Sequence, residues 1–129
     1  MSHFTTIQTR IRDLAALSEA CTEFEVSLVP NTDCRGYAGI TRKAPNVIQL
    51  KGPYDIAVDP SDNNDGTYGL TTDWWDGHVA REVGDGYGRL LQSYGVHKTM
   101  REAHLRGLRT TRKVEADGSI LLTLEGGAL

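Results

Sequence analysis

Residues 79–108 read VAREVGDGYGRLLQSYGVHKTMREAHLRGL, and this stretch decides the fold. Its apolar residues recur at steps of four and three, which places them on one face of a helix. They are Val79, Val83, Tyr87, Leu90 and Tyr94, and after Gly95 the spacing resumes at Val96, Met100 and Ala103. The pattern predicts the longest helical element of the chain, divided at Gly95 and ended at Gly107. Any sheet in the protein is expected to cover its apolar face.

Glycines weaken the first part of this stretch. They occupy positions 84, 86 and 88, and each costs about 1 kcal/mol relative to alanine inside a helix. The first part is therefore expected to be weak or bent.

The remaining chain predicts one more helix and several strands. Asp13 is a suitable N-cap for a helix that reaches Phe24, with Leu14, Leu17 and Cys21 on one stripe. Strands are predicted at residues 3–11, 25–29, 37–41, 46–50, 54–58 and 67–74, the second being ended by Pro30. Residues 109–115 and 119–125 flank Asp117-Gly118, a preferred tight turn, and predict a C-terminal β-hairpin whose Ile120, Leu122 and Leu124 cover the helices.

The order of these elements predicts an α+β fold, with a mainly antiparallel sheet packed against two or three helices. The length of 129 residues fits a single domain, residues 1–129. The 39% hydrophobic and 24% charged residues are ordinary for a globular protein. The first residues lack the layout of a signal peptide, and no run approaches the roughly 20 apolar residues that cross a bilayer. We therefore expect a soluble protein of the cytoplasm that does not engage membranes.

Charge is distributed unevenly along the chain. Residues 53–86 hold eight acids against Arg81 alone, and residues 89–113 hold seven bases against Glu102 alone. The two regions either face each other, or are solvated, or the second forms a positive surface for an anion, a nucleotide or an acidic partner. The residues chosen for a ligand-binding basic patch are Arg89, His97, Lys98, Arg101 and Arg106. The overall pI of about 5.7 argues against sequence-specific nucleic-acid binding.

No residue set satisfies the requirements of a catalytic or metal site. The loop at residues 59–66 is rich in oxygen ligands, but Thr72 stands where a calcium loop needs a bidentate glutamate. His97 and His104 lie two helical turns apart, and neither a paired C-x-x-C nor an H-E-x-x-H occurs. Asp73 and Asp76 flank two tryptophans and His78 follows, so that a carboxylate beside a histidine could do acid–base work, but a capping aspartate and core tryptophans explain these residues better. Cys21 is expected to be buried and Cys34, in a turn-like stretch, more exposed. We predict no catalytic residue, no metal and no cofactor.

Several short motifs together resemble a known family. They are Met1-Ser2-His3-Phe4 with Ile7 and Ile11, Gly36-Tyr37-Ala38-Gly39, Gln92-Ser93-Tyr94, and residues 114–122 with their Asp117-Gly118-Ser119 turn. In order and spacing they resemble the thirty-fifth hypothetical chloroplast reading frame, an uncharacterised family of cyanobacteria, algal plastids and other bacteria. The resemblance covers nearly the whole chain. It implies a small soluble protein of about this length, located in the plastid stroma if plastid-encoded, and it carries over no activity and no site residue.

Two functions follow as the leading hypotheses, and an enzyme, of which a metal- or nucleotide-dependent hydrolase would be the least surprising version, is the third. The first is a non-enzymatic accessory or binding module that acts through protein–protein contact. The alternative is binding of a small anionic ligand, a nucleotide or phosphate, by the basic patch within residues 89–113.

Overall fold

The computed structural model describes residues 4–126, and these form two separate antiparallel sheets and three α-helices. The larger sheet has the strand order β1-β5-β4-β3-β2. Its strands are β1 (Phe4–Gln8), β2 (Ser27–Arg35), β3 (Thr41–Gln49), β4 (Ile56–Pro60) and β5 (Tyr68–Asp73). The helices are α1 (Leu14–Glu23), α2 (His78–Val83) and α3 (Gly88–Leu105). The smaller sheet is the hairpin of β6 (Leu108–Val114) and β7 (Ile120–Gly126). The α+β prediction with its C-terminal hairpin is confirmed.

Helix α1 forms as its sequence predicts. The Asp13 carboxylate accepts a hydrogen bond from the Ala16 N–H at 3.1 Å, which satisfies one of the free donors of the first turn. The helix then buries Leu17, Ala20 and Cys21 completely, and its C-cap is Phe24.

The main core lies between the larger sheet and the helices. From the sheet it takes Ile48, Ile56 and Leu70, and from the helices it takes residues such as Leu17 and Leu90. Burial of large aliphatic side chains contributes about 1.5–3 kcal/mol each. A smaller cluster, Cys34, Ala44, Val47 and Ala57, packs with Phe4 elsewhere on the sheet. Cys34 is fully buried in β2, so the expectation that it is more exposed than Cys21 is wrong.

The long helical stretch breaks within its glycine-rich first part, which was expected to be weak or bent, and not at Gly95, where its division was predicted. Gly84, Gly86 and Tyr87 have positive φ angles, and this turn separates α2 from α3. Gly95 lies inside α3, whose hydrogen-bonded turns continue through it. Successive left-handed residues interrupt a helix outright, whereas one helical glycine only weakens it. Gly107, with a φ of 74°, follows the end of α3 as expected.

Two strands also differ from their predicted bounds. Strand β2 continues through Pro30 to Arg35, because it is the edge of the sheet, where a missing N–H leaves no ladder bond unmade. Residues 37–39 form a 3₁₀ turn instead of a strand, and β3 begins at Thr41. The predicted first strand begins at Phe4 in the described chain, and residues 1–3, including His3, lie outside the described residues.

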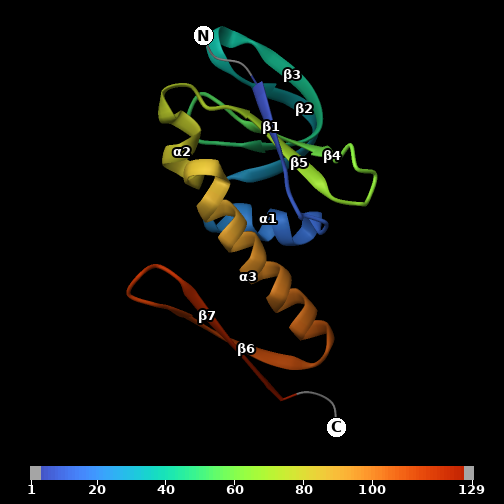
Figure 1. Ribbon diagram of the computed structural model, residues 1–129, viewed down its shortest axis with the longest axis vertical. Helices are drawn as coiled ribbons and strands as arrows, with labels where there is room; N and C mark the ends of the chain where they lie inside the picture. Colours follow the sequence, from blue (N-terminus) through green and yellow to red (C-terminus); the bar gives the residue numbers. More distant parts are fainter. Residues whose placement is uncertain (1–3, 127–129) are drawn as a thin grey trace.

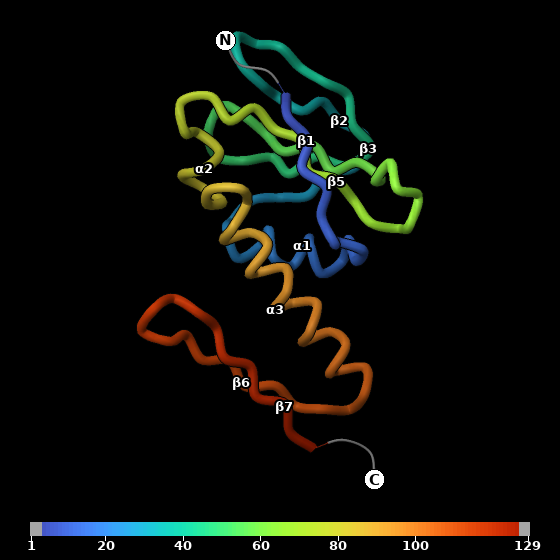
Figure 2. The backbone as a smooth tube through the Cα atoms, in the orientation of Figure 1, coloured from blue at the N-terminus to red at the C-terminus, as the bar shows by residue number. Residues whose placement is uncertain are grey.

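Figure 1 shows α3 leaving the larger sheet and extending away from it, with the β6–β7 hairpin lying across its second half. Figure 2 shows the same course of the backbone, with the hairpin at the opposite end from the β2–β3 pair. We call the larger sheet with α1, α2 and the first half of α3 the body. The apolar face of the long helical stretch is thus covered by two sheets, because the larger sheet packs against α2 and the first half of α3, and the hairpin packs along the outer part of α3. Ile120 and Leu122 are half-buried, and Leu124 is 45% exposed.

No described helix is long and apolar enough to cross a membrane.

Candidate functional site

The five basic residues predicted as a patch are spread along the whole of α3. Arg89 lies in its first turn and Arg106 directly follows its last residue. Seventeen residues at 1.5 Å each separate them, so they stand about 25 Å apart. Arg89 also turns back toward α2, where its Nη2 donates to the Arg81 carbonyl at 2.7 Å. The structure brings together only His97, Lys98 and Arg101.

These three side chains face carboxylates of the same chain. Arg101 Nη1 lies 2.8 Å from Glu19 Oε1, and its Nε lies 3.4 Å from Asp13 Oδ2. Lys98 Nζ lies 2.9 Å from Glu102 Oε1. The hydrogen bonds to Glu19 and Glu102 raise the pKa of Arg101 and of Lys98, respectively. The acids that meet the basic region thus come mainly from α1, and not from residues 53–86.

Glu23 at the end of α1 is the centre of a polar cluster. Its carboxylate accepts from His97 Nε2 at 2.7 Å and from Ser93 Oγ at 3.2 Å, and it forms an ion pair with Arg112 of β6. The bond from Arg112, followed by those from His97 and Ser93, lowers the pKa of Glu23 to about 2, although burial opposes the shift. The cluster joins α1, α3 and β6.

The same cluster is not arranged for nucleophilic catalysis. A serine nucleophile needs a base that takes its proton. Ser93 donates to Glu23, whereas the second nitrogen of His97, Nδ1, lies 3.3 Å from Glu19. The two thiols are not suitable nucleophiles either, because burial raises the pKa of Cys21 and of Cys34 to about 12 and so disfavours the thiolate.

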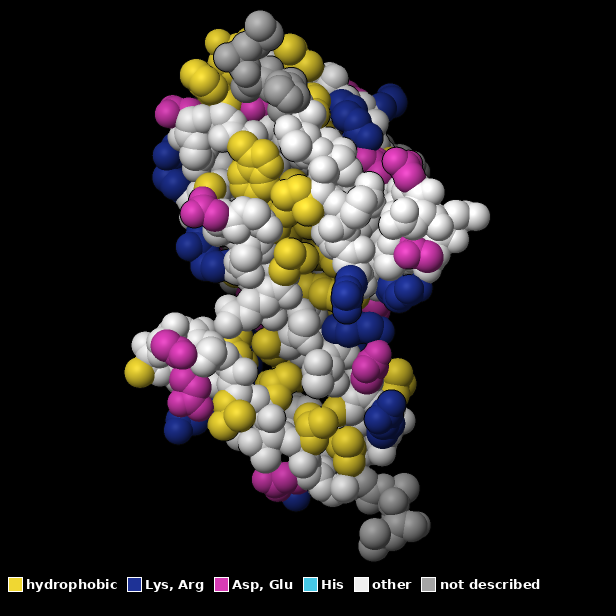
Figure 3. All heavy atoms as spheres, viewed as in Figure 1, with side chains coloured by type: hydrophobic (Ala, Val, Ile, Leu, Met, Phe, Trp, Pro, Cys, Tyr) yellow, Lys and Arg dark blue, Asp and Glu magenta, His cyan; other side chains and the backbone are white. Residues whose placement is uncertain are grey.

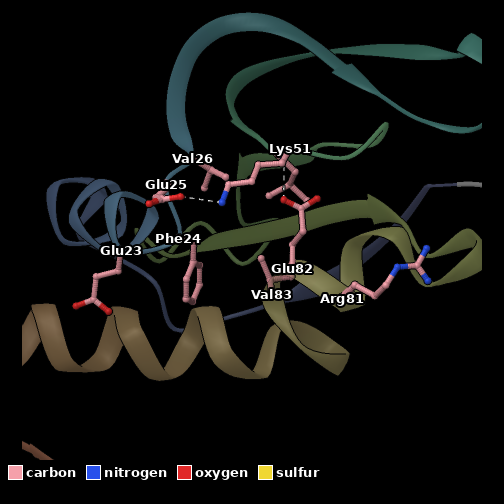
Figure 4. A pocket seen from close by; sticks show the side chains of 9 residues that line it. Glu23, Phe24, Glu25, Val26, Lys51, Arg81, Glu82 and Val83 are labelled. Carbon is pink, nitrogen blue, oxygen red and sulfur yellow. Dashed lines mark hydrogen bonds and ion pairs between the residues drawn. The ribbon is translucent and has the colours of Figure 1, made fainter.

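Two cavities border this region. One, of about 350 Å³, lies between α1, α3 and β6 and is lined by Glu19, Met100, Arg101, His104, Leu105 and Thr110. The other, of about 340 Å³, lies where α1, the end of β3 and α2 meet. Figure 4 shows that its polar groups are already engaged: Lys51 Nζ donates to Glu25, and Glu82 accepts from the backbone N–H of Lys51 at 2.8 Å, while Arg81 points away. In the cavity beside β6, the two charged lining residues Glu19 and Arg101 pair with each other at 2.8 Å.

Within residues 4–126, no group of three or more histidine, cysteine or acidic side chains could hold a metal ion. In the acidic loop, the Asp65 carboxylate accepts from the Thr67 N–H at 3.1 Å and from the Thr67 hydroxyl. These bonds lower the pKa of Asp65. The carboxylate therefore shapes the loop itself.

A pair of exposed aromatic rings lies at the far end of the body. Tyr37 is 40% exposed and Trp75 is 45% exposed, and their rings meet edge to face with centroids 5.6 Å apart. Ile40 beside the turn is 56% exposed. We call Tyr37, Ile40 and Trp75 the aromatic end.

A buried aspartate holds both loops of the aromatic end. Asp73, only 2% exposed, accepts from the Tyr37 N–H through Oδ2 at 3.2 Å and from the Trp75 N–H through Oδ1 at 3.0 Å. Each loop also contains a non-glycine residue in the left-handed region, Ala38 with φ 56° and Asp76 with φ 55°. Such residues persist only where the surroundings fix them, so the backbone of the loops that carry Tyr37 and Trp75 is held in one defined arrangement.

Sequence reasoning missed this surface because it placed both tryptophans in the core. Trp74 does pack against the core, with its ring 4.7 Å from that of Tyr87. Trp75 follows the end of β5, where the chain turns, and points outward. The Trp74-Trp75 pair itself could have predicted the exposed ring, because successive residues of a strand point to opposite sides.

A second exposed apolar surface lies on the hairpin and the adjacent end of α3. Leu105 is 83% exposed, Val114 63%, Leu121 51% and Leu124 45%. In Figure 3, yellow side chains gather on this end, beyond the point where the molecule narrows. The molecule thus exposes apolar groups at both ends.

A family model described as "Protein of unknown function (DUF1257)" matches residues 20–123. The match runs from α1 into β7 and so includes both sheets except β1. No curated protein and no solved structure matches the chain.

Proposed function

This chain belongs to the family described as protein of unknown function DUF1257, and within that family we propose that it is a non-enzymatic accessory module that binds another protein at its aromatic end. The observation that carries this proposal is the clamp of buried Asp73 on the two loops that present Tyr37 and Trp75. Tryptophan and tyrosine are the residues most enriched at the energetic centres of protein interfaces.

Preorganisation supports the proposal energetically. A partner that docks on mobile aromatic rings must first order them, which costs about 0.5–1.5 kcal/mol for each side chain. Here the strained turns at Ala38 and Asp76, which cost about 1–3 kcal/mol each, are already formed in the free protein. Folding has therefore already ordered the backbone of both loops before a partner arrives.

The surroundings favour a partner segment that carries a basic side chain beside an apolar one. The side chain of Asp76 is 70% exposed next to Trp75. A lysine or arginine could pair with this carboxylate and lie over the indole ring, a contact that contributes about 0.5–1 kcal/mol at an exposed site.

Affinity capture of partner proteins from cells that express this protein at its native level tests the proposal. We expect the wild-type protein to retain a reproducible partner set, and the Trp75→Ala variant to bind the same partners at least about tenfold more weakly, since removal of an interface centre costs about 2 kcal/mol or more. Because Trp75 is half exposed, the thermal midpoint of the variant should stay close to that of the wild type.

The matched control is Val114→Ala on the hairpin, which removes an exposed apolar side chain from the other end of the molecule. It should leave capture unchanged. Recovery of only background proteins by the wild type, or equal capture by all three proteins, would contradict the proposed function.

Binding of a small anion is the alternative proposal. Among the five basic residues, Arg106 is exposed and forms no ion pair within residues 4–126, whereas carboxylates of the chain contact His97, Lys98 and Arg101. Stabilisation by millimolar inorganic phosphate that Arg106→Ala abolishes would favour this alternative, and no stabilisation would remove it.

Three further proposals concern the domain, the family and the compartment of the protein. We propose that residues 1–129 form one domain, that the chain belongs with the thirty-fifth hypothetical chloroplast reading frame inside the DUF1257 family, and that it works in the cytoplasm or plastid stroma. The motif Gly36-Tyr37-Ala38-Gly39, which carries part of that resemblance, also builds one loop of the aromatic end.

A further inference from the structure

Residues 120–124 of strand β7 form an open and uncharged sheet edge. The smaller sheet has only two strands, and an isolated two-stranded hairpin is marginally stable in water. Strand β6 carries Arg109, Arg112 and Lys113, the kind of charge that keeps an edge from pairing with another chain. Residues 120–124 of β7, ILLTL, have no charge and no proline.

The register shows which backbone groups of β7 are free. In an antiparallel pair, alternate residues direct both their N–H and their C=O to the neighbouring strand. The Ser119 carbonyl accepts from the Glu115 N–H at 2.8 Å, and Val114 is opposite Ile120. Leu121 and Thr123 therefore direct their backbone groups to β6, while Ile120, Leu122 and Leu124 direct theirs outward.

We infer that this outward edge pairs with β7 of a second copy of the chain, antiparallel, with Leu122 on the two-fold axis. The two Leu122 residues are then opposite each other, and Ile120 of each copy is opposite Leu124 of the other. All of these residues have outward backbone groups, so the ladder is complete from Ile120 to Leu124. The two hairpins become one four-stranded sheet.

Charge and apolar exposure favour β7 of a second copy of the chain as the strand that pairs with this edge. In the antiparallel pairing, Glu125 is opposite Ser119 of the second copy, so that no like charges meet, whereas a parallel pairing would place Glu125 against itself. Leu124, 45% exposed, gains Ile120 of the second copy as its cross-strand neighbour, and Leu121, 51% exposed, gains Thr123. The same short strand therefore complements itself, as a two-fold interface requires.

Sedimentation velocity over a range of protein concentrations tests the pairing. The wild type should shift from monomer to dimer. In the double variant Leu121→Glu with Thr123→Glu, acids are directly opposite each other across the axis, and the protein should remain monomeric over the same range. In the double variant Leu121→Lys with Thr123→Glu, opposite charges meet instead, and the dimer should return at or below the wild-type concentration. Position 123 is exposed and Leu121 is half exposed, so both variants should fold.

Amide hydrogen exchange on the unmodified chain provides an independent measurement. The N–H groups of Ile120, Leu122 and Leu124 should exchange more slowly as the concentration rises, whereas those of Leu121 and Thr123 should change much less. A wild type that stays monomeric, a double-glutamate variant that dimerises like the wild type, a lysine–glutamate variant that stays monomeric, or exchange at Leu122 that is independent of concentration would each overturn the inference. The last two results would be expected if the edge instead receives a strand of another protein.

The proposed partner surface and this edge lie at opposite ends of the molecule, so the two proposals fail separately. Trp75→Ala should dimerise as the wild type does. The double-glutamate variant should still capture the partners of the aromatic end.

Discussion

At the scale of single residues, the carboxylate of Glu23 joins α1 to α3 and to β6. Arg112, His97 and Ser93 all donate to its carboxylate, and the pKa falls from the ordinary 4.5 to about 2. Because the folded-state pKa lies below the unfolded one, ionised Glu23 stabilises the fold above about pH 4.5 and ceases to do so as the pH falls toward 2. Glu23→Gln should therefore lower the free energy of unfolding by about 1–2 kcal/mol at pH 7, after allowance for solvent screening.

Urea unfolding as a function of pH checks this expectation, with Glu25→Gln as the control. The neighbouring Glu25 is 82% exposed, and among residues 4–126 its one ion pair is with Lys51, so its replacement should change stability by less than about 0.5 kcal/mol. The difference between wild type and Glu23→Gln should shrink from pH 5 toward pH 2, while it should be constant above pH 5. A difference that persists unchanged in acid would show that the glutamine harms the fold for another reason.

Single residues also differ in how far their roles can be predicted. The cap at Asp13 is local, because its partner lies three residues along the chain, and the sequence predicts it correctly. Asp73 bonds to Trp75 locally but also to Tyr37, 36 residues away. That second contact depends on the packing of two loops, and no local pattern predicts it. The aromatic end was therefore not found from the sequence, although both tryptophans were noticed.

At the scale of elements, the turn between α2 and α3 requires a glycine at position 84. Gly84 has φ 84° and ψ 162°, a region open essentially to glycine alone, and an added Cβ would lie 2.9 Å from the Arg89 backbone nitrogen. Gly84→Ala should lower the free energy of unfolding by more than about 1 kcal/mol. Gly95 lies inside α3 with no atom within 4 Å of an added Cβ, so Gly95→Ala should raise it by about 0.5–1 kcal/mol.

Thermal unfolding of the two variants, side by side, measures both effects. The two substitutions add the same methyl group, and hence any difference reflects the backbone at each position. If both destabilised the protein equally, the turn would not be the conformational constraint described. Equal stabilisation would mean that residues 79–108 form one continuous helix, as the apolar spacing alone suggests.

Elements with local signals were predicted well, and those that depend on their neighbours were not. The Asp117-Gly118 turn places the final hairpin correctly, since its type needs only those residues. The extension of β2 past Pro30 depends on its edge position, which requires knowledge of the strand order. The place of the helix break could not be chosen between Gly95 and residues 84–87, because the spacing of apolar residues continues across both.

At the scale of the whole molecule, the chain places its hairpin on a helix that leaves the body. The sequence indicates the hairpin and the helix, but not that the hairpin forms a separate sheet. Segregated charge has a structural role in this arrangement. Lys98 and Arg101 of α3 pair with Asp13 and Glu19 at α1, and Arg112 of β6 pairs with Glu23 of the same helix. Several bases of the basic region therefore form ion pairs within the protein. Of the five residues predicted to bind a ligand, the three in the middle of α3, His97, Lys98 and Arg101, are the ones that form ion pairs with carboxylates of the described chain.

The attachment of the hairpin to the body leads to a last prediction. Among the described residues, Arg112–Glu23 is the only ion pair that joins the hairpin to α1. Arg112→Ala should therefore let β6 and β7 open locally, and the exchange rates of their amides should rise about 5–30-fold, the equivalent of 1–2 kcal/mol. Core amides such as those of Ile48 and Ile56 should keep their rates, because β3 and β4 lie in the other sheet. Arg109→Ala, which changes an exposed base of the same strand, should alter neither set. Equal acceleration of the core amides would show instead that the hairpin and the body unfold as one cooperative unit.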